Sequence, residues 1–363
     1  MISIDQNTRR RTTRLGVTAF DEERACPGYV MFTPNFGPGE PRIIDLHGNI
    51  IHRWQMPHPP GFWGYVLPNG NLFYNCKVRD DSPVPFPTWA ILKGGAMIET
   101  DWNGNILWEH HDNWHHHDGR RTESGGAIYL GLYRVPDEFA ETVKGGIPVE
   151  EGIDMWADEL VEVDAEGNRV WSWLAHEHMD VETEVLTFNH PRENWTHGNT
   201  IAPLPDDRVL VSFRSISTVC IIDKATGNIE WKMGGDVLAQ QHDPSMLDNG
   251  NVLIFDNGTQ RRNDAFAFSR VIEVDPATSE IVWEYRDQPM LNFHSNIISG
   301  ARRLPNGNTL ITEGFFGRIF QVTPEGEVVW EYINPHFDTN PFFGEVNGIF
   351  RAEHYMPGEI PGL

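Results

Sequence analysis

Six copies of one hairpin pattern, spread along the whole chain, constrain the fold more than any other feature of this sequence. Each copy has an apolar strand ending in Asp or a similar residue, a turn rich in Gly and Asn, and a second strand that reaches an aromatic residue. Such turns between alternating apolar runs predict a β-hairpin in every copy. The shared aromatic residues, with His52 or Trp54 near the equivalent place in the first copy, are Trp108, Trp171, Trp231, Trp283 and Trp330.

A second hairpin precedes most of these copies, as in "GYVLPNGNLFYN" from residue 64 and "SMLDNGNVLIFDN" from residue 245. Two hairpins per repeat give four antiparallel strands, which is the unit of a β-propeller. The chain is therefore predicted to be all-β, a six-bladed β-propeller. The first copy lacks an innermost strand, while "VNGIFRAEH" from residue 346 is a spare one. We expect the N- and C-terminal strands to pair and to close the ring, which removes exposed strand edges.

One closed ring accounts for the 363 residues, so residues 1–363 are predicted to form a single domain. Residues 1–27 are expected to be an N-terminal extension. Two irregular segments, 133–160 and 175–195, are expected to be loop insertions, and the first holds the best helical signal, "PDEFAETVKGG" from residue 136. Together with the proline-rich stretch from residue 79, these segments can roof an active site.

Composition and charge limit the partners of the protein. Hydrophobic residues make up 39% of the chain, which is enough for a buried core, and the formal net charge is −24. This charge argues against nucleic acid and against an anionic membrane as partners, so an anionic ligand needs a local positive pocket. The three cysteines, Cys26, Cys76 and Cys220, form no metal-binding pattern and are expected to be free thiols. The N-terminal arginines 9–11 precede no apolar run typical of a signal peptide, so a cytoplasmic location is expected.

Three histidines occupy corresponding positions in successive repeats. His117 lies ten residues before Ala127 and His242 lies ten before Val252, while His197 lies twelve before Val209 in a copy with a longer turn. The innermost strands of a propeller line its central channel, so residues at their starts converge at one mouth. Each histidine has a polar companion, and the companions are Asp118, Asn199 and Asp243. The pattern predicts a histidine site in the channel.

Other residues join this prediction on weaker grounds. His116 precedes His117 and His294 lies fifteen residues before Thr309, so both are candidate substrate-binding residues. Arg214 follows the apolar strand of the His197 hairpin, where it either turns over the channel or forms a surface ion pair. A guanidinium is a planar donor suited to sulfate, phosphate or carboxylate, so Arg214 can supply the positive pocket.

Several stretches of the chain resemble the bacterial arylsulfotransferases and their relatives. The similarity rests on "WTHGNTIAPLPDDRVLVSFRS" from residue 195, "QHDPSMLDNGNVLIFDNG" from 241, "LPNGNTLITEG" from 304, "NGIFRAEHY" from 347, and "HHD" at 116–118. The resemblance implies a six-bladed propeller that moves a sulfuryl group between phenolic compounds through a sulfo-histidine. It implies His242 as the nucleophile, with His197, Asn199 and Arg214 binding the sulfuryl oxygens, and His117 as a further oxygen ligand or acid.

The residue types suit this chemistry. A neutral imidazole can attack sulfur and split one displacement into two easier steps. Asp243 is a candidate for orienting an imidazole. The aromatic residues Phe62, Trp63, Trp89 and Trp195 are candidates for a wall that binds an aromatic small molecule, although packing in the core is the better explanation of them.

Two other functions remain open at this stage. His117, His197 and His242, with Asp118, Asp243 or Glu313 nearby, are also a ligand set for a divalent metal in the central channel, which would favour a lyase or hydrolase acting on an aromatic small molecule. Arg214 separates this alternative from anion transfer, because a cationic metal gains nothing from a neighbouring arginine. The third function is a non-catalytic propeller that binds a partner on its face. No cofactor is certain, and assembly as a homo-oligomer is left open.

Overall fold

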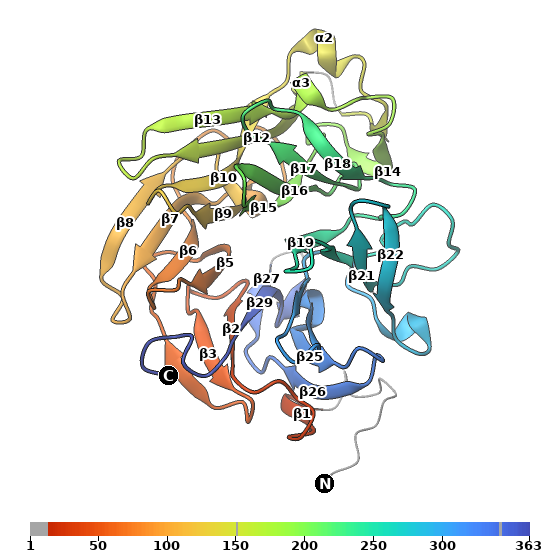
Figure 1. The fold of residues 1–363 in the computed structure, drawn as a ribbon. Coiled ribbons are helices and arrows are strands. Elements are labelled where there is room, and N and C mark those ends of the chain that lie inside the picture. The colour runs from red at the N-terminus through yellow and green to blue at the C-terminus, as the bar shows by residue number, and fades with distance from the viewer. Residues whose placement is uncertain (1–13, 150–151, 341–342) are drawn as a thin grey trace.

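The computed structural model describes residues 14–149, 152–340 and 343–363. In this part of the chain the strands form six sheets of at least four antiparallel strands, arranged as blades around a central axis (Figure 1). The prediction of an all-β six-bladed propeller is confirmed. No helix within the described ranges has the length and apolar character needed to cross a membrane.

The blades are numbered in chain order from the blade that contains β2 (Tyr29–Pro34), and their strands are given from the axis outward. The innermost strands are β29 (Ile349–Tyr355), β5 (Pro60–Val66), β9 (His116–Arg121), β15 (Gly198–Leu204), β19 (His242–Met246) and β23 (Gly300–Arg303). The second strands are β2 (Tyr29–Pro34), β6 (Leu72–Lys77), β10 (Ala127–Arg134), β16 (Arg208–Phe213), β20 (Val252–Asp256) and β24 (Thr309–Glu313). The third strands are β3 (Arg42–Asp45), β7 (Gly95–Thr100), β12 (Trp156–Val163), β17 (Thr218–Asp223), β21 (Arg270–Asp275) and β25 (Arg318–Val322). The outer strands are β4 (Ile50–Arg53), β8 (Ile106–His111), β13 (Arg169–Leu174), β18 (Ile229–Met233), β22 (Glu280–Tyr285) and β26 (Val328–Ile333).

The ring closes at both ends of the chain, as the spare strand predicts. The C-terminal strand β29 pairs antiparallel with β2 and becomes the inner strand of the first blade. In Figure 1 the blue β29 accordingly lies beside the red-orange β2. A second closure was not expected, because β1 (Gly16–Phe20) pairs with β26 as a fifth strand of the last blade. Part of the segment expected to be an N-terminal extension therefore belongs to the propeller.

The expected insertions contain the remaining short elements. The first holds α2 (Asp137–Ala140) and β11 (Gly145–Ile147), and it ends where β12 begins. The second holds α3 (Ala175–His178) and β14 (Leu186–Pro191), and β14 pairs with β11 in parallel, so the two insertions contact each other. The other elements outside the blades are α1 (Trp89–Leu92), two 3-10 turns, η2 (Met290–Asn292) and η3 (Gly314–Phe316), and a hairpin of β27 (Asp338–Asn340) and β28 (Gly344–Val346).

The apolar core lies between blades rather than inside one of them. On β6, the alternate residues Leu72 and Tyr74 pack toward the first blade, whereas Phe73 packs toward the third. Side chains of a strand alternate between its two faces, so a blade covered by neighbours on both sides needs apolar residues at successive positions. This explains the unbroken apolar runs at the centre of each repeat.

The repeated tryptophan joins each blade to the next. In all six blades, an indole N–H of the outer strand or its end donates to the turn between the third and fourth strands of the following blade. The bonds run from Trp54 to Asp101 O, Trp108 to Ala165 O, Trp171 to Lys224 O, Trp231 to Ser279 Oγ, Trp283 to Pro324 O and Trp330 to Leu46 O, with lengths of 2.8–3.3 Å. The last bond joins the sixth blade to the first, so the series is closed.

Candidate active site

Four of the innermost strands begin at one mouth of the ring with an irregular turn of backbone. The pairing of β9, β15 and β19 with the second strand of each blade shifts register at this end. His117 and Asp243, within these shifts, have positive φ values of 52° and 53°, and His197, just before its strand, has a φ of 51°. On β5, Phe62 has a φ of 96°. Non-glycine residues with positive φ and bulges beside a channel are typical of functional sites, because the surrounding fold must hold them in place.

The structure brings together the three histidines that the repeat register aligns. The ring centroids of His117 and His197 are 4.9 Å apart. Phe350, at the start of β29, lies 6.4 Å from His117 and 6.2 Å from His242 between centroids. His117 also stacks on Phe62 at 4.7 Å. His117 and His242 are buried, whereas His197 is partly exposed.

A neighbouring amide fixes the tautomer of His242. The Nδ2 group of Asn257 donates to the carbonyl oxygens of Ser295 and Ile298, at 2.8 and 2.9 Å. This orientation turns Oδ1 of Asn257 toward Nδ1 of His242, 2.8 Å away. Because an amide oxygen only accepts, the imidazole proton must lie on Nδ1. Nε2 of His242 then carries the free lone pair that a nucleophile needs.

The opposite tautomer is set at His197. The Nδ2 group of Asn194 donates to Nδ1 of His197 at 2.9 Å, so the proton of a neutral His197 lies on Nε2. His197 thus offers an N–H donor at the mouth, whereas His242 offers an acceptor. Neither Asn194 nor Asn257 was predicted from the sequence.

Arg214 turns toward the histidines and has no carboxylate partner within 4.0 Å among the described residues. Its Nη1 donates to Nε2 of His190 at 3.3 Å, and Nδ1 of His190 lies 3.3 Å from Oγ of Ser215. The Arg214 backbone N–H also donates to the carbonyl of His197. His190 comes from β14, so the second insertion supplies a residue that orients Arg214.

The side chains of His116 and Asp158 form a second group in contact with His117. Nδ1 of His116 lies 2.8 Å from Nδ1 of His117. Nε2 of His116 lies 3.1 Å from Oδ1 of Asp158, which is an ion-pair distance, although the alignment is poor for a hydrogen bond. The other oxygen of Asp158 accepts hydrogen bonds from Thr196 and from the backbone of Gly198. Asp158 therefore ties the position of His116 to the strand that carries His197.

Burial and neighbouring positive charge keep these imidazoles neutral. Burial and the Arg214 cation lower the pKa of His242 to about 3, against the opposing effect of its hydrogen bond to Asn257. Burial likewise places the pKa of His117 and of His197 well below the usual range, with contributions from the other histidines and Arg214. The mutual effect on pKa is what groups in one shared site are expected to show.

Two of the predicted polar companions lie below the histidines instead of beside them. Asp243 binds Arg302 through both oxygens and lies 3.0 Å from Arg351. Asp118 accepts from Arg351 and from the indole of Trp63. Asp118, Asp243 and Arg351 are nearly inaccessible and Arg302 is partly exposed, so ion pairs fill the axis beneath the mouth. Asp243 does not orient an imidazole.

Asn199 and the predicted aromatic wall also lie elsewhere. The Asn199 amide donates to the carbonyl of Gln241 at the junction of two blades. Trp63 lies between the guanidinium groups of Arg120 and Arg351, and Trp195 is packed in the core with Phe139. Core packing is therefore the better explanation of these tryptophans.

Three further predicted residues have other surroundings. His294 lies after η2, where its backbone N–H donates to the carboxylate of Glu313. Glu313 itself pairs with Arg318 in the core of the last blade. Trp89, on α1, is buried but lines a cavity beside the mouth.

The histidine mouth does not fit a metal centre. Within the described ranges, no group of three or more His, Cys, Asp or Glu side chains is arranged to hold a metal ion. The nearby carboxylates of Asp118 and Asp243 are neutralised by arginines, and Arg214 adds a cation at the mouth. A divalent ion would therefore meet positive charge without a compensating ligand.

Comparison with known proteins identifies the family of the chain. The family model described as arylsulfotransferase (ASST) matches residues 94–335, which is two thirds of the chain. The chain belongs to the arylsulfotransferase family. Membership of this family indicates a sulfotransferase-type enzyme, and the matched span contains His117, His190, His197, Arg214 and His242. No curated protein matches the chain.

Solved structures resemble this arylsulfotransferase-family chain in fold alone, because their sequence identities are low. A protein of unknown function from Bacteroides caccae has a TM-score of 0.52 at 13% identity, covering 90% of this chain and 98% of that one. The hydrazine synthase of Kuenenia stuttgartiensis has a TM-score of 0.50 at 11% identity, covering 89% and 81%. A streptogramin B lyase has a TM-score of 0.49 at 12% identity, covering 94% and 93%.

Proposed function

We propose that this protein transfers a sulfuryl group from a phenolic sulfate ester to a second phenol through a sulfo-histidine at His242. The observation that carries the proposal is the hydrogen bond from Nδ1 of His242 to Asn257, because it leaves the Nε2 lone pair free beside a cation. In the first step Nε2 bonds to sulfur, and the bond from sulfur to the aryl oxygen breaks. The leaving phenolate takes a proton from the enzyme.

The sulfuryl oxygens would be held by Arg214 and by the Nε2–H of His197. Both are donors whose positions are set before substrate binds, by His190 and Asn194 respectively. Donors that are already oriented toward developing charge stabilise a transition state without further reorganisation.

The proton for the leaving phenolate would come from His117. When Nε2 of His117 gives up its proton, Nδ1 of His117 recovers one from Nδ1 of His116. In this proposal the carboxylate of Asp158 would stabilise positive charge on the His116 ring when both of its nitrogens hold a proton for this transfer. In the second step the acceptor phenol returns a proton along the same path, its oxygen bonds to sulfur, and the bond from sulfur to Nε2 of His242 breaks.

Mass spectrometry of the intact protein after brief mixing with 4-nitrophenyl sulfate tests this proposal. We expect one sulfuryl group on the wild type and on His111→Asn, a control in which an exposed histidine of β8 is replaced. We expect none on His242→Asn, and we expect phenol to remove the group from the wild type. Sulfuryl transfer to phenol by His242→Asn at the wild-type rate would contradict the proposal.

A further inference from the structure

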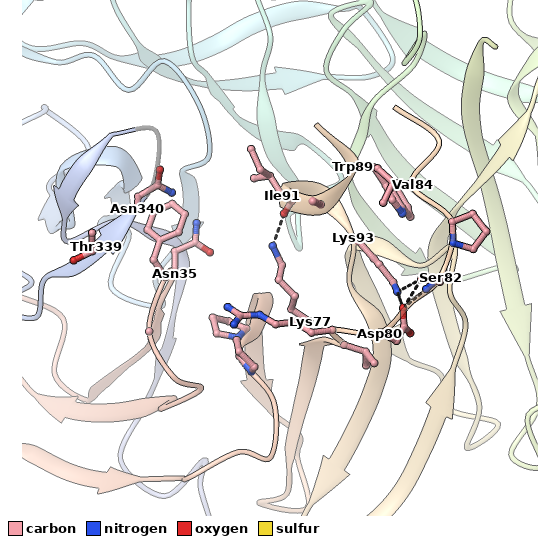
Figure 2. Close-up of a pocket in the computed structure, with 18 residues that line it drawn as sticks. Asn35, Lys77, Asp80, Ser82, Val84, Trp89, Ile91, Lys93, Thr339 and Asn340 are labelled. Atoms are coloured by element: carbon pink, nitrogen blue, oxygen red, sulfur yellow. Dashed lines mark hydrogen bonds and ion pairs between the residues drawn. The ribbon is translucent and has the colours of Figure 1, made fainter. Parts of the chain in front are cut away.

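A cavity of about 400 Å³ opens between the first two blades, next to the histidine mouth. Its floor includes Pro60 on β5 and Lys77 on β6, and its walls come from the segment 78–93 and from the hairpin at Thr339 (Figure 2). The wall segment is anchored by Lys93, which lies 2.6 Å from Asp80 and also bonds to Ser82. The cavity therefore has fixed sides.

Phe62 connects this cavity to the histidines. The ammonium of Lys77 lies over the Phe62 ring, 5.5 Å from its centroid, and the imidazole of His117 stacks on the same ring at 4.7 Å. Phe62 is held in the strained backbone conformation described above. A molecule in the cavity would thus lie one phenyl ring away from the sulfuryl-transfer residues.

Two cations of the cavity lack carboxylate partners. Neither Lys77 nor Arg79 has an Asp or Glu oxygen within 4.0 Å in the described part of the chain, and Lys77 donates only to the carbonyl of Ile91. Figure 2 shows the Lys77 side chain extending across the cavity to that carbonyl. Asp80, the acidic residue of the lining, is already neutralised by Lys93. The cavity therefore has positive potential in a protein of net charge −24.

The acid–base behaviour of Lys77 agrees with this geometry. Burial, together with the charge of Arg79, lowers the pKa of Lys77 to about 8. An anion placed between these two groups would relieve both effects. The remaining lining is largely apolar, with Pro60, Val84, Trp89 and Ile91, which suits a flat hydrocarbon ring.

We propose that this cavity binds a phenolic carboxylic acid, with its carboxylate on Lys77 and its ring against the apolar walls. The role of that ligand as the sulfuryl acceptor rests on the function proposed above, whereas its binding does not. The sulfate of a donor ester belongs at Arg214, so the second positive site selects a different anionic substituent. A carboxylate on the ring is the simplest group that meets Lys77 and Arg79 in a cavity whose remaining lining is largely apolar.

Calorimetric titration with 4-hydroxybenzoate, in the absence of any sulfate ester, tests the binding. The neutral amide 4-hydroxybenzamide has nearly the same shape and serves as the matched ligand. We expect the carboxylate to bind at least about tenfold more tightly than the amide, because a hydrogen bond to a charged group contributes that much. Lys77→Met should abolish the difference and Lys77→Arg should retain most of it. Lys224→Met, which removes a lysine that packs over Trp171 far from the cavity, should leave it unchanged.

Protection of wild-type Lys77 from acetic anhydride gives a second measurement that needs no variant. We expect 4-hydroxybenzoate, but not the amide, to slow acetylation of Lys77 as followed by peptide mass spectrometry. Equal affinity for both ligands, or unchanged affinity in Lys77→Met with no protection, would overturn the proposal. A sulfo-histidine absent from the protein, combined with carboxylate-selective binding, would refute the transfer reaction and leave the cavity assignment intact.

Discussion

Replacing Arg214 with methionine should make the protein more stable while it removes activity. Burial lowers the pKa of Arg214 from 12.5 to about 10, so its charge is disfavoured in the folded protein by roughly 3 kcal/mol. Methionine would lose the hydrogen bond to His190, at a cost of about 1 kcal/mol. The difference predicts a gain of about 2 kcal/mol in the free energy of unfolding for Arg214→Met.

The sign of this effect follows from the direction of the pKa shift. A base whose pKa is lower in the folded state is penalised at every pH below that lowered value, so the penalty is fully present at pH 7. Urea denaturation at pH 7 measures the gain. Transfer from 4-nitrophenyl sulfate should fall by about 100-fold to 1,000-fold, as expected when a preorganised charge donor is removed.

Arg318→Met provides the matched control. Arg318 is fully buried but pairs with Glu313 and Glu331, at 3.0 and 2.7 Å. Breaking such buried pairs leaves carboxylates without a partner and should cost about 3–5 kcal/mol. If Arg214→Met loses stability as Arg318→Met does, Arg214 is not an unpaired cation and the sulfuryl-binding role loses its physical basis.

Two further predictions concern His242. Asn257→Leu removes the acceptor for Nδ1 of His242, so kcat for sulfuryl transfer should fall about tenfold or more while KM stays nearly constant. Steady-state kinetics measure both constants, and an unchanged kcat would contradict the assignment of the tautomer. The pKa of His242 is about 3 in the folded protein and that of an unfolded histidine is about 6.5, so protonation favours unfolding. The free energy of unfolding should therefore fall as the pH drops from about 6.5 toward 3. In urea titrations, His242→Asn should weaken this pH dependence, whereas His111→Asn should not.

The propeller fold was predictable because the sequence pattern that specifies a blade recurs along the chain. Each repeat carries the same turn chemistry, and Asp101 illustrates it: one carboxylate oxygen accepts the backbone N–H groups of Asn103 and Asn105. The equivalent Asp164 does the same in the next blade. A signal that recurs in every blade can be read without knowing tertiary contacts.

The convergence of His117, His197 and His242 was predictable from the same register, but the direction of their neighbours was not. A β-bulge adds a residue and re-aims the side chains beside it, so strand alternation cannot be counted across it. His117 and Asp243 have the positive φ values of such irregular backbone, and the carboxylates of Asp118 and Asp243 point down the axis to Arg351.

The residues that were missed come from parts of the chain without periodic signal. His190 belongs to an insertion, and Asn257 follows the second strand of its blade by one residue. Asp158 is on the third strand of the blade whose innermost strand carries His116, and the pairing of these strands through β10 brings the two side chains together. Such partners are fixed by three-dimensional contact, so a single sequence gives no spacing from which to infer them.

The closed series of indole bonds around the propeller has a consequence for how precisely the mouth is held. Residues of the mouth come from separate blades, and each would drift if its blade tilted independently of the others. If one blade tilts, the indole bonds to its two neighbouring blades must stretch. Because the bond from Trp330 to Leu46 joins the sixth blade to the first, no blade in the ring can tilt without stretching such bonds. The closed ring of indole bonds thus restrains all six blades together. Substitutions in the outermost turns that accept these bonds should therefore change the positions of the histidines at the centre.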